Sequence, residues 1–184
     1  MGTPTLGTAR LVLRPYSDDD IPELMPLIGA REVAATTLRI PHPYSLADAE
    51  EFVRRSMEDQ VRVAITLADS GKLVGGVGLR LDDGHNRAEL GYWIGVPFWG
   101  NGYATEASRA MIEYGFGELK LDRIYASHTT NNPASGNVLR KLSMKYEGCQ
   151  RKHILKWGEY LDLELYGILR QDYRDGRGGT SSNI

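Results

Sequence analysis

The chain has 184 residues, of which 41% are hydrophobic and 25% are charged, and its formal net charge is −2. This composition is typical of a globular protein that can bury a core, and the small negative charge gives no general attraction to nucleic acids or anionic membranes. The single cysteine, Cys149, excludes a disulfide framework and a cysteine-rich zinc site. No stretch reaches the ~20 apolar residues of a transmembrane helix, and the N-terminus lacks the apolar core of a signal peptide, so we expect a cytoplasmic location.

The N-terminal part of the chain predicts a short strand, helical segments and a loop before the main sheet begins. The run 10–15 is a strand that ends at a proline, and 17–28 starts with a serine cap and contains Pro26, which favours two short or kinked turns. No clean period extends over 31–44, which we interpret as a long loop. The next segment, 45–60, has the apolar spacing of an amphipathic helix.

The rest of the chain predicts a sheet that is interrupted by two helices. Strands are expected at 61–68, 72–81 and 87–96, joined by tight turns. The following elements are a helix at 103–119, a strand at 122–129, a helix at 132–144 and strands at 146–155 and 159–173. We therefore expect an α/β (α+β) fold, a mixed and mostly antiparallel seven-stranded sheet with about four helices and a central βαβ crossover. We expect one domain over 1–175, followed by a disordered tail at 176–184.

The strand at 87–96 leads into the helix at 103–119 through a turn that contains Gly100 and Gly102. Glycine adopts positive φ without strain and allows a ligand to approach the backbone closely. The first N–H groups of a helix lack partners within the helix, and the helix dipole adds partial positive charge there. The turn therefore predicts a pyrophosphate cradle, and the alternative is a turn that needs glycine only for its shape.

Two nucleotide-binding motifs do not fit this turn. The dinucleotide fingerprint needs a third glycine where this chain has Thr105, and Asp122 precedes a strand, whereas the ribose-binding acid follows one. The Walker loop needs a Gly-Lys-Ser/Thr sequence, which the chain lacks. The turn is therefore not interpreted as either of these sites.

Three ordered blocks of the sequence carry a family pattern. They are AELGYWIG (88–95), WGNGYATEA (99–107) and NPASGNVLRKLSM (132–144). Together with the closing strands, they resemble the GCN5-related N-acetyltransferase (GNAT) family and, within it, the RimJ/RimL-like branch. The resemblance extends over residues 8–173 and implies a GNAT-like fold, acetyl-CoA as the co-substrate and N-acetyltransferase activity.

The acetyl-CoA loop of this family reads Gln/Arg-x-x-Gly-x-Gly/Ala, and Gly102 and Ala104 match its last two small positions. Trp99 stands at the first position, a departure that is common in the RimJ/RimL-like branch. In such proteins the pantetheine arm enters between the strand ending at 94–95 and the strand starting near Arg123. For the aromatic residues Trp93, Phe98 and Trp99 we expect packing of the loop against the sheet, and direct contact with the co-substrate is the alternative. The resemblance implies acetyl-CoA contacts from Trp93, Ile94, Gly95, Trp99, Gly100, Asn101, Gly102, Tyr103, Ala104, Thr105, Asn132 and Ser135.

Amine acetylation needs a neutral amine and a proton for the leaving thiolate, so it needs groups that move protons. Glu89 shares a strand face with Trp93 and is the first candidate base, unless a salt bridge with Arg80 or Arg87 occupies it. His153, on a closing strand, is the second candidate, because the resemblance places it near a glutamate base of some relatives. A solvated strand histidine is the alternative for His153.

The sequence Asn132-Pro133-Ala134-Ser135 opens the helix at 132–144. Asn132 suits an N-cap and Pro133 suits the first helical turn, so capping alone could explain both residues. The resemblance adds that Ser135 lies near the sulfur of CoA and binds or protonates it. His128 could also reach the cleft. The histidines and Cys149 show no ligand spacing, so we predict no metal site.

The acceptor is the least determined part of the prediction. The resemblance implies an amine acceptor, namely the N-terminal α-amine of a peptide or protein. A small amine such as an antibiotic, a polyamine or an amino acid is an alternative, and a non-catalytic acyl-CoA-binding module is another. The segment 31–44 has no acidic cluster, which argues against polycationic acceptors. We expect no nucleic-acid or membrane partner, and by analogy a homodimer could form through the sheet edge or the apolar closing strand.

Overall fold

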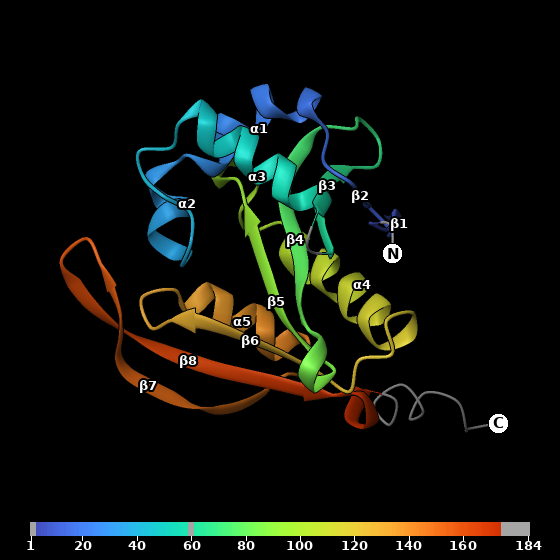
Figure 1. The fold of residues 1–184 in the computed structure, drawn as a ribbon, viewed down its shortest axis with the longest axis vertical. Helices are drawn as coiled ribbons and strands as arrows, with labels where there is room; N and C mark the ends of the chain where they lie inside the picture. The colour runs from blue at the N-terminus through green and yellow to red at the C-terminus, as the bar shows by residue number, and fades with distance from the viewer. Residues whose placement is uncertain (1–2, 59–60, 174–184) are drawn as a thin grey trace.

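The computed structural model describes residues 3–58 and 61–173 and arranges them as an eight-stranded sheet with helices on both faces (Figure 1). The strands are β1 Leu6–Gly7, β2 Leu11–Arg14, β3 Val61–Leu67, β4 Leu73–Asp82, β5 Arg87–Ile94, β6 Arg123–Thr129, β7 Lys145–Lys156 and β8 Glu159–Leu169. The α-helices are α1 Ile21–Ile28, α2 Arg31–Thr36, α3 Leu46–Glu58, α4 Tyr103–Gly117 and α5 Pro133–Lys141. Short 3-10 turns lie at Asp18–Asp20, Asp83–His85 and Val96–Phe98. The tail predicted to be disordered, 176–184, lies outside the described residues.

The strand order is β1-β2-β3-β4-β5-β6-β8-β7, and every pair except β5 with β6 is antiparallel. The helix α4 connects the two parallel strands, so the predicted central βαβ crossover is confirmed. The predicted count of seven strands is wrong by one. The extra strand is β1, whose two residues pair with Val12 and Leu13 and are too short to show a period of their own.

Two further boundaries differ from the sequence prediction. Residues 31–36 form the helix α2 within the segment that we expected to be a loop, and the ammonium of Lys156 donates hydrogen bonds to the carbonyls of Ala34 and Thr37 at its C-terminal end. The final strand ends at Leu169, and 170–173 are helical. In addition, β8 lies between β6 and β7, so the apolar closing strand is interior to the sheet and β7 forms its edge.

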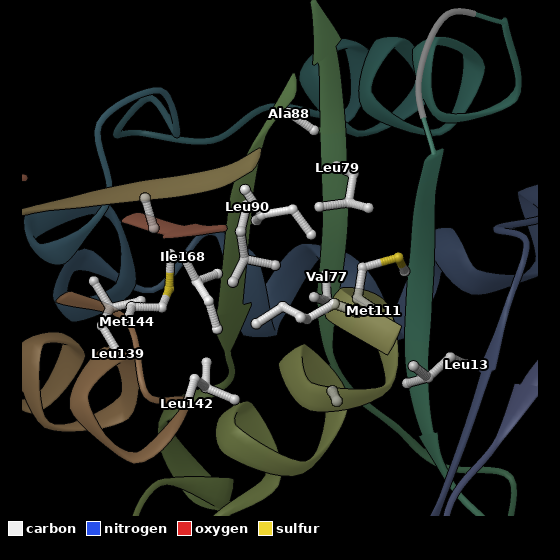
Figure 2. Close-up of a cluster of buried hydrophobic side chains, with 14 of the residues drawn as sticks. Leu13, Val77, Leu79, Ala88, Leu90, Met111, Leu139, Leu142, Met144 and Ile168 are labelled. Carbon is white, nitrogen blue, oxygen red and sulfur yellow. The ribbon is translucent and has the colours of Figure 1, made fainter. Parts of the chain in front are cut away.

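The two faces of the sheet bury separate hydrophobic clusters. The larger one lies between the sheet and α4 and α5, and Figure 2 shows its side chains meeting from β2, β4, β5, β8 and both helices. The second lies beneath α1, α2 and α3. Each large side chain that is fully buried in such a cluster stabilises the fold by about 1.5–3 kcal/mol. Helical spacing predicts a buried face of α4 made of Ala104, Ala107, Met111, Ile112 and Phe116. The last four are buried, and Ala104 is half-buried.

The C-terminal end of helix α4 lies very close to the sheet. A Cβ added at Gly115 would come within 2.8 Å of the Ile124 side chain and 3.0 Å of the Leu79 side chain. A larger residue at this position would require the ends of these side chains to shift. Within residues 3–58 and 61–173, no helix combines the length and the apolar character needed to cross a bilayer.

Candidate active site

The parallel pairing of β5 with β6 stops halfway along both strands. Only three residue pairs are in register, and the last is Glu89 with Tyr125. Beyond it β5 continues to Ile94 and β6 to Thr129, and the two strands diverge (Figure 1). A cavity of about 560 Å³ occupies the divergence and is lined by both strands. The sheet is thus open where an extended ligand could lie beside strand backbone.

Alternation along β5 gives the two sides of this opening different side chains. Trp93 belongs to the cluster beneath α1, α2 and α3, so Glu89 and Gly91 point to that face as well. Leu90 belongs to the opposite cluster, and Tyr92 packs against it. The cavity is therefore bordered by Glu89 on one face of the sheet and by Tyr92 on the other.

The glycine turn forms one end of the cavity. Gly100 and Gly102 have φ values of +79° and +80°, and both line the cavity together with the first residues of α4. The indole N–H of Trp99 donates to the carbonyl oxygen of Ile94 over 2.7 Å, which ties the turn to the end of β5. The first N–H groups of α4 have no acceptor within the helix. The turn thus has the geometry of an anion cradle.

Glu106, in the first turn of α4, anchors this cradle to the N-terminal strands. Its carboxylate accepts hydrogen bonds from the Thr8 hydroxyl at 2.7 Å, from the Arg10 backbone at 2.9 Å and from Arg10 Nε at 2.8 Å. Burial alone would raise the pKa of Glu106, but these hydrogen bonds outweigh it and lower the pKa below its ordinary value. This anchor was not predicted from the sequence because the partners of Glu106 are 96 and 98 residues away.

Ser135 lies on the opposite wall and forms a hydroxyl pair with Tyr92. The two side-chain oxygens are 2.7 Å apart, and the Tyr92 hydroxyl also donates to the Ser135 carbonyl oxygen at 3.3 Å. Burial raises the pKa of Tyr92 to about 12, although the hydrogen bond with Ser135 acts in the other direction. Tyr92 is not among the site residues predicted from the sequence. The available signal was its place in the strand alternation, on the face opposite Glu89.

Glu89 is held by two arginines. Arg80 donates to its Oε2 through Nε at 3.0 Å and through Nη2, and Arg39 donates to the same oxygen at 3.1 Å. The predicted partner Arg80 is therefore present, whereas Arg87 pairs with Asp82. Since all three of these bonds end on Oε2, Oε1 is the oxygen that remains to accept a proton from a water or an amine.

Residues 10–145 match the sequence model of the acetyltransferase (GNAT) domain, which spans most of the chain. The chain belongs to the GNAT family. It is therefore an acyltransferase, and the resemblance found in the sequence is confirmed.

Several proteins are similar to this GNAT protein in sequence or in structure. The uncharacterised N-acetyltransferase p20 of Bacillus licheniformis is 31% identical over 175 residues, covering 92% of this chain and 98% of p20. The [ribosomal protein uS5]-alanine N-acetyltransferase of Escherichia coli is 33% identical over 88 residues, or 48% of this chain and 45% of that protein. A solved spermidine N-acetyltransferase from Vibrio cholerae, in complex with CoA and spermine, superposes with a TM-score of 0.80 at 23% identity, covering 91% of this chain and 99% of that one.

The GNAT cavity collects most of the residues that the sequence analysis singled out. Those that line it are Glu89, Trp93, Ile94, Trp99, Gly100, Gly102, Tyr103, Ala104, Thr105, Asn132 and Ser135. Asn132 accepts a hydrogen bond from the backbone N–H of Ser135 at 3.2 Å and so caps α5, and its amide also donates to the carbonyl of Thr36. The predicted N-cap is therefore confirmed.

Three of the predicted site residues are not among those that line the cavity. Gly95 packs against α1, where an added Cβ would lie 2.7 Å from the Leu27 side chain. The Asn101 side chain donates to the carbonyls of Phe98 and Trp99 and shapes the turn from outside. His153 is exposed on β7, at an irregularity in the pairing with β8.

His128, the remaining histidine of interest, lines the cavity but is buried within its wall. Its Nδ1 is 2.9 Å from the Thr129 carbonyl oxygen, and its Nε2 is 3.1 Å from a carboxylate oxygen of Glu164. Within the part of the chain that the structure describes, no cluster of three or more histidine, cysteine or acidic side chains could hold a metal ion.

Proposed function

We propose that this GNAT protein transfers an acetyl group from acetyl-CoA directly to the α-amine of a peptide or protein N-terminus. The observation that supports this proposal is the single cavity that joins the glycine turn, the Tyr92–Ser135 pair and Glu89. These are a candidate anion cradle, a candidate proton donor and a candidate proton acceptor. The cavity passes through the gap between β5 and β6, so a donor on one face of the sheet and an acceptor on the other could meet.

The residues present fit an acyl-CoA. When bound, acetyl-CoA supplies an acetyl thioester together with a pyrophosphate and a 3′-phosphate. The turn at Gly100 and Gly102 offers backbone N–H groups to the pyrophosphate. A second hollow of about 510 Å³ adjoins this turn. Its lining includes the cations Arg109 and Lys141, which are suited to a further phosphate, together with the carboxylates Glu106 and Glu113.

An α-amine can be acetylated without a strong general base. With a pKa of about 7.7–8.0, roughly a tenth of such an amine is already neutral at pH 7, against about 0.04% of a lysine side chain. Glu89 Oε1 could take the remaining proton, directly or through a water, as the nitrogen–carbon bond forms. Arg39 and Arg80 on Oε2 hold the carboxylate in place for this step.

The carbon–sulfur bond breaks in the same reaction, and the sulfur must gain a proton or an equivalent hydrogen bond. The hydroxyl pair of Tyr92 and Ser135 is suited to this role because Tyr92, whose pKa is raised to about 12, stays protonated at neutral pH and can donate to the Ser135 hydroxyl oxygen, so the serine proton can be directed to the sulfur. Direct transfer needs no covalent enzyme intermediate. The atoms balance with one proton lost by nitrogen and one gained by sulfur.

Isothermal titration with acetyl-CoA tests the cofactor part of the proposal. We expect micromolar binding by the wild type and loss of binding in Gly102→Trp, whose indole would fill the cradle. Gly71→Trp is the matched control, because Gly71 also has a positive φ, +71°, with no atom within 4 Å of an added Cβ, but lies in the β3–β4 turn. No binding by the wild type, or equal loss in both variants, would refute the cradle.

Turnover tests the catalytic part. Peptides with free α-amines are offered with acetyl-CoA, and the released thiol is measured. We expect the Glu89→Ala, Ser135→Ala double variant to lose turnover and to keep its affinity for CoA. A wild type that binds acetyl-CoA but releases no thiol with any amine would instead support a non-catalytic acyl-CoA-binding module.

A further inference from the structure

A space that no side chain fills lies next to Glu89 on the same face of the sheet. Alternation along β5 gives this face Glu89, Gly91 and Trp93, and an added Cβ at Gly91 would meet no atom within 4 Å. Gly78, the partner of Gly91 on β4, also has no side chain and lines the cavity as well. The space above Gly91 is therefore bordered along β5 by a carboxylate and an indole, and we call it the Gly91 hollow.

The position on the other side of Glu89 is occupied. Arg87, two residues before Glu89, is opposite Asp82 on β4 and donates to its carboxylate at 2.9 Å. The strands β5 and β6 also pair there, and their pairing ends at Glu89 and Tyr125. The Gly91 hollow therefore lies on the side of Glu89 where the two strands diverge and the sheet is open.

Apolar side chains from the helical layer contribute to this face of the cavity. Those that line the cavity and belong to, or pack against, the cluster beneath α1, α2 and α3 are Val33, Ile40, Phe52 and Trp93. The Phe52 ring lies beside the glycine row, because Arg62, opposite Gly78 on β3, has its guanidinium 4.9 Å from the ring centroid. Ile40 and Phe52 are only partly buried, so an apolar ligand group would remove more of their surface from water.

Several polar side chains on this face already have partners within the protein. Arg39 and Arg80 both donate to Glu89. The hydroxyls of Thr36 and Thr37, which line the cavity as well, donate to carbonyls of α2. A polar ligand group would have to share or break these bonds, whereas an apolar group would leave them intact.

The spacing along β5 sets which part of an acceptor reaches the hollow. Residues two apart on one face of a strand are about 7 Å from each other. A peptide whose α-amine meets Glu89 therefore has the side chain of its first residue within reach of Gly91. The glycine turn lies beyond the end of β5 at Ile94, so the hollow is separate from the end of the cavity suited to phosphates.

We infer that the Gly91 hollow binds the side chain of the acceptor's first residue, and that this side chain is apolar and larger than a methyl group. The acceptor class is then a peptide or protein that begins with a residue such as leucine, methionine or phenylalanine. This inference rests on the proposed function and narrows it. A free apolar amino acid carries the same group, and the experiment below distinguishes it from a peptide.

Peptides that differ only in their first residue test the inference with the wild-type protein in the thiol-release assay. The C-terminally amidated peptides X-Ser-Ala-Ala carry leucine, asparagine, alanine or glycine as X, and free leucine is the comparison without a peptide. Leucine and asparagine have similar sizes and differ in polarity. Several pH values allow the fraction of neutral amine to be matched. We expect kcat/KM for the leucine peptide to exceed that for the asparagine and glycine peptides by about tenfold or more.

The variant Gly91→Ala tests the position of the hollow. Gly91 is not at a positive φ and an added Cβ has room, so the substitution should not disturb folding. The methyl group occupies part of the hollow, so kcat/KM for the leucine peptide should fall about tenfold while that for the glycine peptide changes little. The control Gly117→Ala adds the same methyl group in open space at the end of α4, outside the cavity lining, and should leave the preference unchanged.

The outcomes separate the inference from the proposed function. Equal or better use of the asparagine or glycine peptide overturns the apolar class while acetylation itself stands. A leucine preference that is unchanged in Gly91→Ala overturns the assignment to the Gly91 hollow. Free leucine used better than the leucine peptide overturns the peptide as the source of the side chain. If acetyl-CoA binds and no α-amine is acetylated, the proposed function fails and the inference fails with it.

Discussion

The hydroxyl pair of Tyr92 and Ser135 gives the sharpest prediction, in the form of a double-mutant cycle. The two oxygens are 2.7 Å apart, and the variants Tyr92→Phe and Ser135→Ala each remove one of them. Neither change should unfold the protein. The cap of α5 uses the Asn132 side chain and the backbone N–H of Ser135, so it does not need the serine hydroxyl.

The expected loss of kcat in each variant follows from the role of the hydroxyl that it removes. If Ser135 donates the proton to sulfur, Ser135→Ala should lower kcat about 100-fold, the lower end for general acid catalysis, because water can partly replace the hydroxyl. This corresponds to about 2.7 kcal/mol. Tyr92→Phe removes the hydrogen bond that orients Ser135, and such a bond contributes about 1 kcal/mol net, so kcat should fall five- to tenfold, roughly.

Tyr92 and Ser135 act as a unit if the only role of the Tyr92 hydroxyl is to orient Ser135. The double variant should then be no slower than Ser135→Ala alone, so the interaction free energy should be about 1–1.4 kcal/mol. The assays are kcat by thiol release, acetyl-CoA affinity by titration and thermal unfolding. Affinity should change little, and the melting temperature should fall by no more than about 2–4 °C for each kcal/mol lost. Independent effects that multiply, or an unchanged kcat in Ser135→Ala, would refute the assignment.

Three further changes have defined outcomes. Gly91→Val should lower kcat/KM for the acceptor about tenfold or more by filling the open space above β5, and an unchanged value would show that the acceptor lies elsewhere. Asp20 is buried, which would raise its pKa, but hydrogen bonds from Arg14 and a backbone N–H lower it overall. The contribution of Asp20 to the free energy of unfolding, about 2 kcal/mol, should therefore be complete above the pKa that Asp20 has in the unfolded state, ~3.9. It should be lost as the pH falls below that value. Urea unfolding of Asp20→Asn should thus differ from the wild type at pH 7 and converge with it in acid, and a constant difference would contradict this. Lys156→Met should lower the melting temperature by about 2–4 °C by removing the donor to two carbonyls of α2, as calorimetry can measure.

Local rules were enough to predict the glycine turn and the helix that follows it. The strand period of 87–96, the helical spacing of Ala107, Met111 and Phe116 and the two glycines between them all depend on neighbours within a few residues. The N-cap at Asn132 is local as well, because its side chain bonds the backbone three residues on. The strand, the glycine turn, the helix and the N-cap could therefore be predicted from the sequence, and the structure confirms all four.

Contacts between distant segments decided the rest. The helix α2 was not predicted, because it has only six residues, too few to show a clear period, and its end is bound by Lys156, about 120 residues further along the chain. The same is true of the site, where Tyr92 meets Ser135 across 43 residues and Arg39 meets Glu89 across 50. A side chain's partners over such separations depend on strand order and register. The sequence by itself therefore determined the family and the glycine turn at one end of the cavity, and only the tertiary structure decided which side chains meet along the rest of it.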